Sequence, residues 1–372
     1  MSLRVLYITN EDRRIGGSSL SLETLLSCVG DAVEPILLFR EAGPVRDRFA
    51  ALGYRCLVVP YYRASFQAKG LSRVLRWLPH FFARAVTQRR CVRRVRRQVG
   101  KVDLVHSNSA TVDIGPRIAK ALGVPHVWHI REYPDTGLGL RFFPSARAWR
   151  RKLLSSDAVV AITPGLLGHL CLPAALCIPD AVLPASAAVL VLPKAPEVVF
   201  LAGTLAPHKR PDEAIEIFAR AALPEPYKLV LAGEVEDGYR RKLLSLAEAL
   251  GASERVEFRP FTADVRALLS RAAAVLVCTA YEGMGRVAVE ALFYGCPVIA
   301  RGSGGSRDVL AEGLHGSLYD TPEQAAAALR AVVSDFPEAQ VRAAADYAAA
   351  TFSTDSYGAR ILSLYRSLSP SK

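Results

Sequence analysis

The sequence predicts an α/β fold made of two Rossmann-like domains that face each other across a cleft. Short apolar runs rich in β-branched residues alternate with helical patterns along the 372 residues, as expected when helices connect the strands of parallel sheets. The alternation stops once, at a proline-containing stretch, and then starts again. A chain of this length is also too long for one typical hydrophobic core, which favours two domains.

The predicted strands form two groups, one on each side of that stretch. The first group is expected at residues 4–9, 35–39, 56–60, 103–106, 126–130 and 158–162, and the second at 198–202, 228–232, 256–259, 274–278 and 297–300. We therefore expect a first domain at residues 1–183, a linker with three prolines at 184–196, and a second domain at 197–354. A final helix at about 355–368 carries an apolar stripe and can pack back on the first domain.

The net charge of +12 is concentrated in the first half of the chain. Residues 1–190 hold 27 Lys and Arg against 13 Asp and Glu, whereas the remaining residues hold 20 against 22. A basic half is expected to meet an anionic partner, such as a lipid surface, a phosphorylated acceptor or nucleic acid. No apolar run is long enough for a membrane span, and the N-terminal apolar run is too short for a signal peptide. We therefore expect a cytoplasmic protein.

Much of the positive charge lies in residues 71–101, where arginines surround a helical valine stripe. The first half of this stretch holds large apolar side chains, Trp77, Leu78, Phe81 and Phe82. Aromatic side chains beside dense arginine favour peripheral binding to an anionic membrane, here the inner face of the plasma membrane. The alternative is an ordinary amphipathic helix with a solvated face. No nucleic-acid-binding motif is present, so no nucleic acid partner is expected.

The most informative stretch, residues 279–306, reads as a loop, a helix, a strand and a second glycine turn after a buried strand. Glu282 lies on the loop and Glu290 in the helix. Both carboxylates are expected near the carboxyl edge of the sheet, beside a helix N-terminus whose free N–H groups attract an anion such as phosphate. A phosphate at the helix end, with carboxylates that accept hydroxyl hydrogen bonds, suits a nucleotide sugar.

Three other segments carry candidate binding residues. Lys209 and Arg210 follow the first strand of the second sheet, where they can neutralise a diphosphate; the alternative is a solvated loop. His129 ends a strand of the first sheet and is expected to face the cleft, with a structural histidine as the alternative. Gly16 and Gly17 form a turn before a serine-capped helix, which is either a phosphate-approach loop or an ordinary tight turn.

No metal or cofactor is expected from the sequence. The seven cysteines are scattered without metal-site spacing and are expected to be reduced. No strand ends in an Asp-x-Asp pair, and neither a Walker loop nor a Gly-x-Ser-x-Gly motif is present. The negative charge of a phosphate would then be neutralised by Lys209, Arg210 and helix ends.

These features, in this order, resemble the retaining glycosyltransferases of family 4, which have the GT-B architecture. The resemblance spans nearly the whole chain. Its specific part contains Glu282-Gly283-Met284-Gly285, Glu290-Ala291, Gly295-Cys296-Pro297-Val298 and Gly304-Gly305. It implies transfer of a sugar from a nucleotide diphosphate sugar to a saccharide or lipid-linked acceptor. A UDP-sugar is favoured as the donor, and a GDP-sugar is the alternative. The implied setting is bacterial surface or lipid-linked glycan synthesis.

The resemblance implies roles for residues of the second domain. Glu282 would hold hydroxyls of the donor sugar, and Glu290 would hold those of the ribose. Lys209 would bind the diphosphate together with the backbone of Gly283, Met284 and Gly285. The family needs no metal, and the leaving phosphate would take the proton of the acceptor.

The remaining implied roles lie in both domains. His129 would lie over the donor sugar near the reacting centre and would complete a catalytic set with Lys209 and Glu282. The backbone of Gly16 and Gly17 would approach the phosphates. The nucleotide base would be lined by Arg259 and Phe261.

Three positions depart from the family pattern. Thr204, at a donor-binding position, stands where the family has arginine, and Arg210 is the candidate to replace that cation. Met284 replaces an aromatic residue, and Asp308 replaces a longer acidic side chain. The rival interpretations are a nucleotide-sugar epimerase of the same architecture and a non-catalytic nucleotide-sugar-binding or membrane-associated scaffold. The epimerase family lacks the Glu282/Glu290 arrangement, and a phosphorylase would need a much longer chain.

Overall fold

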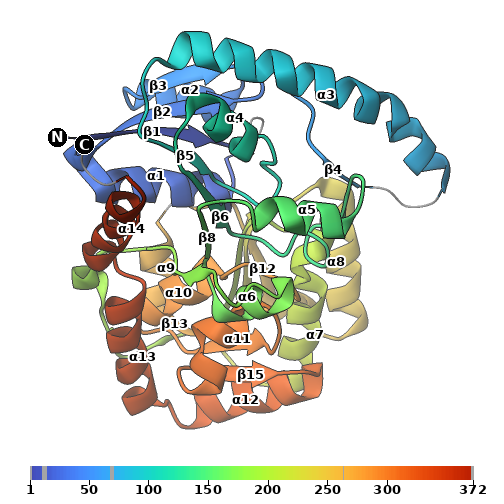
Figure 1. Cartoon of the computed structure of the whole chain (residues 1–372). Helices are drawn as coiled ribbons and strands as arrows, with labels where there is room; N and C mark the ends of the chain where they lie inside the picture. Colours follow the sequence, from blue (N-terminus) through green and yellow to red (C-terminus); the bar gives the residue numbers. More distant parts are fainter. Residues whose placement is uncertain (1, 11–14, 68–70, 263, 370–372) are drawn as a thin grey trace. The chain divides into compact units, whose positions relative to one another are not determined.

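The computed structural model describes residues 2–10, 15–67, 71–262 and 264–369, with the backbone alone for residues 67, 71–78 and 80–82. The chain forms two compact units (Figure 1). One consists of Met1–Ala181 with Thr354–Lys372, and the other of Val182–Ser353. Each is built on a parallel sheet whose strands are connected by helices, which confirms the predicted α/β class with two Rossmann-like domains.

The first unit contains a seven-stranded parallel sheet of order β3-β2-β1-β5-β6-β8-β9. Its strands are β1 (Leu3–Ile8), β2 (Val33–Phe39), β3 (Arg55–Val58), β5 (Leu104–Ser107), β6 (His126–Ile130), β8 (Ala158–Ala161) and β9 (Leu176–Cys177). The strand order changes direction at β1 and β5, the place where Rossmann-like sheets bind ligands. A short antiparallel pair, β4 (Ser65–Gln67) with β7 (Leu140–Phe142), forms a separate sheet.

Helices cover this sheet, and their bounds are α1 (Gly17–Val29), α2 (Pro44–Ala51), α3 (Leu71–Val99), α4 (Gly115–Leu122), α5 (Ala146–Leu153), α6 (Pro164–Leu170) and α14 (Thr354–Leu368). The serine cap expected for the first helix is not formed, because Gly16 occupies the N-cap position without a side-chain hydrogen bond. The Ser18 hydroxyl instead donates to Asn10 Oδ1, 3.2 Å away.

The C-terminal helix α14 belongs to the first unit and contributes to its core. Its apolar stripe, Tyr357, Ile361, Leu364 and Tyr365, is buried in the same cluster as residues of β1 and α1. Gly358 allows α14 to cross α1 closely, because a Cβ at this position would overlap the carbonyl group of Cys28. The core of the first unit is thus assembled from segments at both ends of the chain.

The basic stretch forms the long helix α3, whose C-terminal half packs on α4. Cys91, Val95 and Val99 are buried in one cluster with Ile118 and Ala119 of α4. The side chains of Trp77, Leu78, Phe81 and Phe82, on which the membrane prediction partly rests, lie outside the residues that the structure describes.

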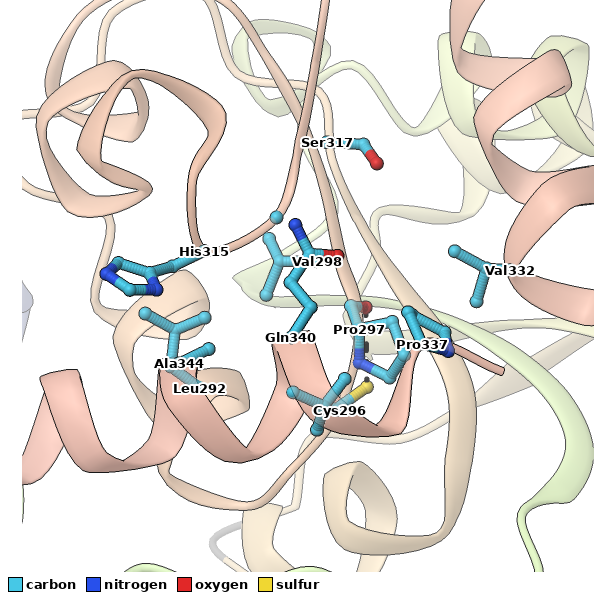
Figure 2. A pocket seen from close by; sticks show the side chains of 12 residues that line it. Leu292, Cys296, Pro297, Val298, His315, Ser317, Val332, Pro337, Gln340 and Ala344 are labelled. Atoms are coloured by element: carbon cyan, nitrogen blue, oxygen red, sulfur yellow. Dashed lines mark hydrogen bonds between the residues drawn. The ribbon is translucent and has the colours of Figure 1, made fainter. Parts of the chain in front are cut away.

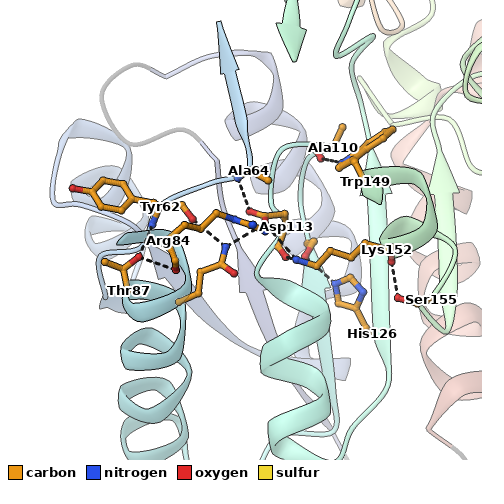
Figure 3. A network of polar contacts seen from close by, with 12 residues as sticks. Tyr62, Ala64, Arg84, Thr87, Ala110, Asp113, His126, Trp149, Lys152 and Ser155 are labelled. Carbon is orange, nitrogen blue, oxygen red and sulfur yellow. Dashed lines mark hydrogen bonds and ion pairs between the residues drawn. The ribbon is translucent and has the colours of Figure 1, made fainter. Parts of the chain in front are cut away.

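A buried carboxylate, Asp113, ties α3 to the rest of the first unit (Figure 3). On one side, Arg84 Nη2 and Gln88 Nε2 lie 2.5 Å and 3.2 Å from Asp113 Oδ2. On the other side, Lys152 Nζ of α5 lies 3.3 Å from the same oxygen. The amide of Ala64 donates to Oδ1 across 3.2 Å. One side chain therefore holds two helices and the segment before β4.

The second unit contains a six-stranded parallel sheet of order β12-β11-β10-β13-β14-β15. Its strands are β10 (Ala195–Thr204), β11 (Lys228–Glu234), β12 (Val256–Arg259), β13 (Ala272–Val277), β14 (Val298–Arg301) and β15 (Ser317–Tyr319). The expected linker, residues 184–196, lies within this unit and contains the turn η2 (Ala185–Ala187) and the start of β10.

The helices of the second unit are α7 (Pro211–Ala221), α8 (Asp237–Ala249), α9 (Val265–Arg271), α10 (Arg286–Phe293), α11 (Gly305–Val309), α12 (Pro322–Ser334) and α13 (Glu338–Thr351). Helix α7 packs on both α8 and α12, and α10 packs on α9 and α13. Inside the sheet, strand β13 is buried along its whole length. An apolar run without alternation is typical of a parallel strand that helices cover on both faces.

Candidate functional site

Lys209 and Glu282 meet at the carboxyl edge of the second sheet. Lys209 ends the turn η3 (Pro207–Lys209) after β10, and Glu282 lies on the loop between β13 and α10. Because β10 and β13 are hydrogen-bonded neighbours, these loops emerge side by side. Lys209 Nζ donates a hydrogen bond to Glu282 Oε1. The side chains remain 29% and 23% exposed, so a ligand can reach both.

The two glycine-containing loops of the informative stretch pack directly on each other. The amide of Gly305 donates to the carbonyl oxygen of Glu282 over 2.8 Å, and the Ser303 hydroxyl donates to the carbonyl oxygen of Ala280 over 2.6 Å. A Cβ at Gly305 would overlap the carbonyl group of Gly283. The second glycine turn therefore fixes the backbone that carries Glu282, and a larger residue at Gly305 would push the loops apart.

Glu290 lies in the second turn of α10 and is mostly buried. Burial raises the pKa of its carboxyl group, and Arg286 opposes that shift. Arg286 Nη2 lies 3.8 Å from Glu290 Oε1, one helical turn away. Gly285 caps the helix with a φ of 84°, a left-handed conformation that favours glycine. Met284, which precedes Gly285, is buried.

The structure also shows residues near this site that the sequence reasoning missed. Arg286 lies in the first turn of α10, and its spacing of four from Glu290 was a readable signal. His208 lies next to Lys209; burial and Lys209 lower the pKa of its imidazole, while Glu282 opposes the shift. Arg286 thus places a cation beside Glu290, and His208 places an imidazole beside the Lys209–Glu282 pair.

Arg210 binds a carboxylate of its own unit. Its Nη2 lies 2.7 Å from Oε2 of the buried Glu213, in the first turn of α7. This carboxylate was also missed, because a glutamate early in a helix usually serves the helix dipole and remains solvated. Thr204, at the end of β10, is exposed. The cation expected to compensate for Thr204 is thus partly engaged inside the protein.

Arg259 and Phe261 line a hollow of about 700 Å³ beside β12 and α9. Phe261 is 52% exposed, whereas Arg259 is held by two carboxylates, with Nη2 2.6 Å from Glu197 Oε1 and Nε 2.7 Å from Glu257 Oε1. The volume lies in the range of small-molecule sites. These two residues are predicted to line the nucleotide base, and the hollow offers a space for it. The Arg259 guanidinium group is already paired with two carboxylates of the protein.

A second hollow in this unit is much smaller (Figure 2). Its volume is about 10 Å³, near the least space that holds one water molecule. It is lined mainly by residues of α10, β14 and α13 with the segment before β15, including Leu292, Val298, His315 and Ala344. It has no room for a substrate.

In the first unit, Gly16 and Gly17 lie at the start of α1, next to the strand-order change. Among the residues that the structure describes, and apart from its chain neighbours and its own helix, no atom lies within 4 Å of a Cβ built at Gly17. Asn108, after β5, anchors this turn by donating from Nδ2 to the carbonyl oxygen of Ser18 over 3.2 Å. The approach of this turn to the donor phosphates stays a prediction.

His129 does not lie at a surface of the first unit. The expectation that its side chain faces an open cleft is therefore corrected, because the ring is fully buried inside strand β6. Its Nε2 lies 3.7 Å from Asp180 Oδ1, and its ring packs against that of His106 at 5.4 Å between centroids. Burial, followed by Arg131, lowers the pKa of His129 far below its usual range, so the imidazole is neutral.

The polar side chain that follows β6, Arg131, was not singled out from the sequence. Its Nε donates to Asp180 Oδ2 over 2.7 Å, and its Nη1 donates to Asn108 Oδ1. Tyr357 of α14 donates to the other oxygen of Asp180 over 2.9 Å. A guanidinium–carboxylate pair thus occupies the place next to His129 at the end of the strand.

Among the residues described here, no three His, Cys, Asp or Glu side chains gather as a metal site. Within the same residues, no helix combines the length and apolar character needed to cross a membrane.

Two family profiles match the chain, one for each unit. Residues 184–349 match the family described as "Glycosyl transferases group 1", and residues 16–170 match the "Glycosyl transferase 4-like domain". Together the two matches support a glycosyltransferase of the family 4 type. Solved structures show the GT-B fold of this family. HepE of Anabaena in complex with UDP has 18% identity and a TM-score of 0.78, covering 98% of this chain and 100% of that chain. The sucrose-phosphate synthase of Thermosynechococcus elongatus has 17% identity and a TM-score of 0.71, covering 98% and 99%.

The curated relatives of this chain include D-inositol 3-phosphate glycosyltransferases. The protein of Mycolicibacterium smegmatis is 35% identical over 171 residues, which are 44% of this chain and 39% of that relative. The protein of Mycobacterium tuberculosis is 35% identical over 192 residues, which are 49% of this chain and 39% of that relative. The chain thus matches about two fifths of the length of these relatives.

Proposed function

We propose that this protein is a retaining glycosyltransferase that moves a sugar from a nucleotide diphosphate sugar to a saccharide or lipid-linked acceptor in bacterial surface glycan synthesis. The observation that carries the proposal is the Lys209–Glu282 pair, an accessible cation and carboxylate on neighbouring loops at the carboxyl edge of the second sheet. We favour a UDP-sugar over a GDP-sugar as the donor. Structures of the similar HepE in complex with UDP and with UDP-glucose support that choice.

In the proposed reaction, Lys209 stabilises the leaving diphosphate and Glu282 accepts hydrogen bonds from hydroxyls of the donor sugar. The bond between the anomeric carbon and the phosphate oxygen breaks, and the bond to the acceptor oxygen forms on the same face. The proton of the acceptor hydroxyl passes to the departing phosphate. Glu290 holds the ribose, and the backbone around Gly285 at the start of α10 holds the phosphates, because helix N-termini bind anions. Lys209, rather than a metal ion, supplies the positive charge.

Donor hydrolysis tests the proposal without a known acceptor. The purified protein is screened against a panel of nucleotide sugars by thermal shift, and release of nucleotide diphosphate is measured with the best ligand. Lys209→Ala and Glu282→Ala are each expected to reduce kcat/KM by about 100-fold or more, as for loss of one group that stabilises transition-state charge. Lys242→Ala and Glu248→Ala, at exposed positions of α8, serve as matched controls. Equal turnover in the site variants and the controls would refute these roles.

We further propose that α3 holds the protein at the inner face of the plasma membrane as a peripheral protein. The supporting observation is the row of exposed arginines on its C-terminal half, Arg89, Arg90, Arg93, Arg94, Arg96 and Arg97, opposite the buried Val95 and Val99. Arginine near an anionic bilayer contributes roughly 1 kcal/mol per residue to binding.

Liposome flotation with phosphatidylglycerol vesicles tests this membrane role. Replacing Arg93, Arg94, Arg96 and Arg97 by Ser is expected to abolish flotation at physiological salt. A control replaces four exposed arginines of the second unit, Arg240, Arg241, Arg307 and Arg342, by Ser. Flotation that is lost equally in both variants would show a dependence on net charge alone and would contradict the assignment to α3.

A further inference from the structure

Glu213 is a buried carboxylate to which the proposed reaction gives no role. It is 1% exposed, and three side chains bind it. Arg301 Nη2 lies 2.6 Å from both of its oxygens, Arg210 Nη2 lies 2.7 Å from Oε2, and the Tyr319 hydroxyl donates to Oε1 over 2.7 Å. The Arg301 guanidinium also lies over the Tyr319 ring. A buried charge persists only with partners of this kind, so the cluster has one favoured arrangement.

The two arginines come from the loops that determine where the Lys209–Glu282 pair lies. Arg210 follows Lys209 directly and has a φ of 60°, a conformation that a non-glycine residue keeps only when its surroundings fix it. Arg301 ends β14 and leads into the glycine turn, whose Gly305 amide donates to the Glu282 carbonyl oxygen. A path of ion pairs and backbone contacts therefore runs from Glu213 to each member of the pair.

We propose that Glu213 is a positioning residue for the Lys209–Glu282 pair. By binding Arg210, it fixes the turn that aims Lys209 across the sheet edge. By binding Arg301, it fixes the glycine turn on which the Glu282 loop rests. The catalytic consequence rests on the proposed function, whereas the position of Lys209 can be measured in the protein without a ligand.

Competitive acetylation with limiting acetic anhydride, followed by peptide mass spectrometry, measures the reactivity of each lysine. Glu213→Gln keeps the size of the side chain and removes its charge. The Lys209–Glu282 ion pair is then expected to be less populated, which exposes the Lys209 amine to the reagent. Labelling of Lys209 is expected to rise about two- to fivefold, the scale for loss of a partly exposed ion pair. Labelling of Lys242 on α8 is expected to stay constant. Unchanged labelling of Lys209 in folded Glu213→Gln protein overturns the proposal.

Two further variants keep the test decisive if Glu213→Gln does not fold. Arg210→Gly cuts one link and suits the left-handed backbone, so it is expected to raise Lys209 labelling. Tyr319→Phe keeps the ring beneath Arg301 and is expected to change labelling little. Glu216→Gln, which removes an exposed pair with Arg220 on the same helix, is the matched control. An equal rise in the Glu216 variant would indicate general loosening of α7 and would overturn the proposal.

Donor hydrolysis separates this inference from the proposed function. In Glu213→Gln, kcat/KM is expected to fall about 10- to 100-fold, the scale expected when a catalytic group is misplaced by about 1 Å. A wild-type protein that hydrolyses none of the donors contradicts the proposed function, and Lys209 labelling still decides the positioning role. Raised labelling with wild-type turnover would show that Glu213 orders the loop without serving the reaction, and would overturn the catalytic part.

Discussion

At the scale of single residues, Glu290 combines burial with a nearby cation, Arg286. Its burial disfavours the charged form and raises its pKa, while Arg286, 3.8 Å away, restores part of the lost stabilisation. A carboxylate in this setting is under-solvated and accepts hydrogen bonds from ligand hydroxyls strongly. Its neighbours favour the ribose-binding role proposed for it.

Replacing Glu290 by Ala is expected to weaken UDP binding by about 10- to 100-fold, because a hydrogen bond to a charged group contributes roughly 1.5–3 kcal/mol. Isothermal titration calorimetry with UDP measures this effect. Since the pKa of Glu290 is raised, the wild-type affinity is expected to fall as the pH is lowered toward 5, and the variant is expected to lack this dependence. Glu248→Ala is the control, and a parallel pH profile in the Glu290 variant would contradict the role.

The sequence predicted the residues whose positions follow from chain order in a parallel sheet. Lys209 and Glu282 follow neighbouring strands, and such loops meet at one edge. His129 was placed wrongly although its strand has the expected bounds, because the ring is buried against His106 and Asp180 within the unit. Glu213 was not predictable, because its partners Arg301 and Tyr319 lie about a hundred residues away.

At the scale of secondary-structure elements, α3 depends on the Asp113 network shown in Figure 3. Burial raises the pKa of Asp113, but Lys152 and Arg84 lower it by more, so the carboxyl group ionises below its usual range. The carboxylate therefore remains charged at neutral pH and holds α3, α5 and the segment before β4 together. The surface proposed to meet a membrane is thus attached to the first unit by an ionic anchor as well as by apolar packing.

Asp113→Asn is expected to destabilise the first unit by about 3–5 kcal/mol at pH 7, because it leaves two mostly buried cations, Arg84 and Lys152, without their buried counter-charge. The three tryptophans, at positions 77, 128 and 149, all lie in the first unit, so urea unfolding followed by tryptophan fluorescence reports on this unit. The folded pKa of Asp113 is lowered, so the difference from wild type persists from neutral pH to about pH 4 and is lost at lower pH. Asp31→Asn, at an exposed position, is the control, and equal midpoints at pH 7 would contradict the anchor role.

Sequence periodicity predicted most of the elements, and the observed ends differ from the predicted ones by up to about three residues. The paired strands β4 and β7 escaped prediction because each has only three residues, too few for a period of two to be read. The helix cap at Gly16 was missed for another reason. Serine is favoured at N-caps, but here the Ser18 hydroxyl has a partner in Asn10, so the backbone turn begins the helix without a side-chain cap.

At the scale of the whole molecule, the two units differ in their buried histidines. His106, His126 and His129 lie fully or almost fully buried on β5 and β6, whereas His208 and His315 of the second unit remain partly exposed. Burial is the main cause that lowers the pKa of all three, to about 3 for His126. These histidines are neutral in the folded protein and gain a proton on unfolding below about pH 6.5.

The first unit is therefore expected to unfold before the second as the pH is lowered from 7.5 to 5. Each buried histidine binds more protons in the unfolded state, so each reduces stability by about 1.4 kcal/mol per pH unit below its unfolded pKa. Urea titrations at several pH values, followed by tryptophan fluorescence, measure this slope. His126→Gln is expected to reduce the slope by about 1.4 kcal/mol per pH unit, and an unchanged slope would contradict this account.

The place of α14 has a consequence for how the chain matures during synthesis. The second unit is inserted between two parts of the first, and its ends meet where the Val182 amide donates to the Phe352 carbonyl oxygen over 2.9 Å. All its strands leave the ribosome before residues 354–368, which complete the first core with Tyr357, Ile361 and Tyr365. The nascent first unit therefore keeps an apolar face exposed while the inserted unit folds. During that interval the chain depends most on chaperones.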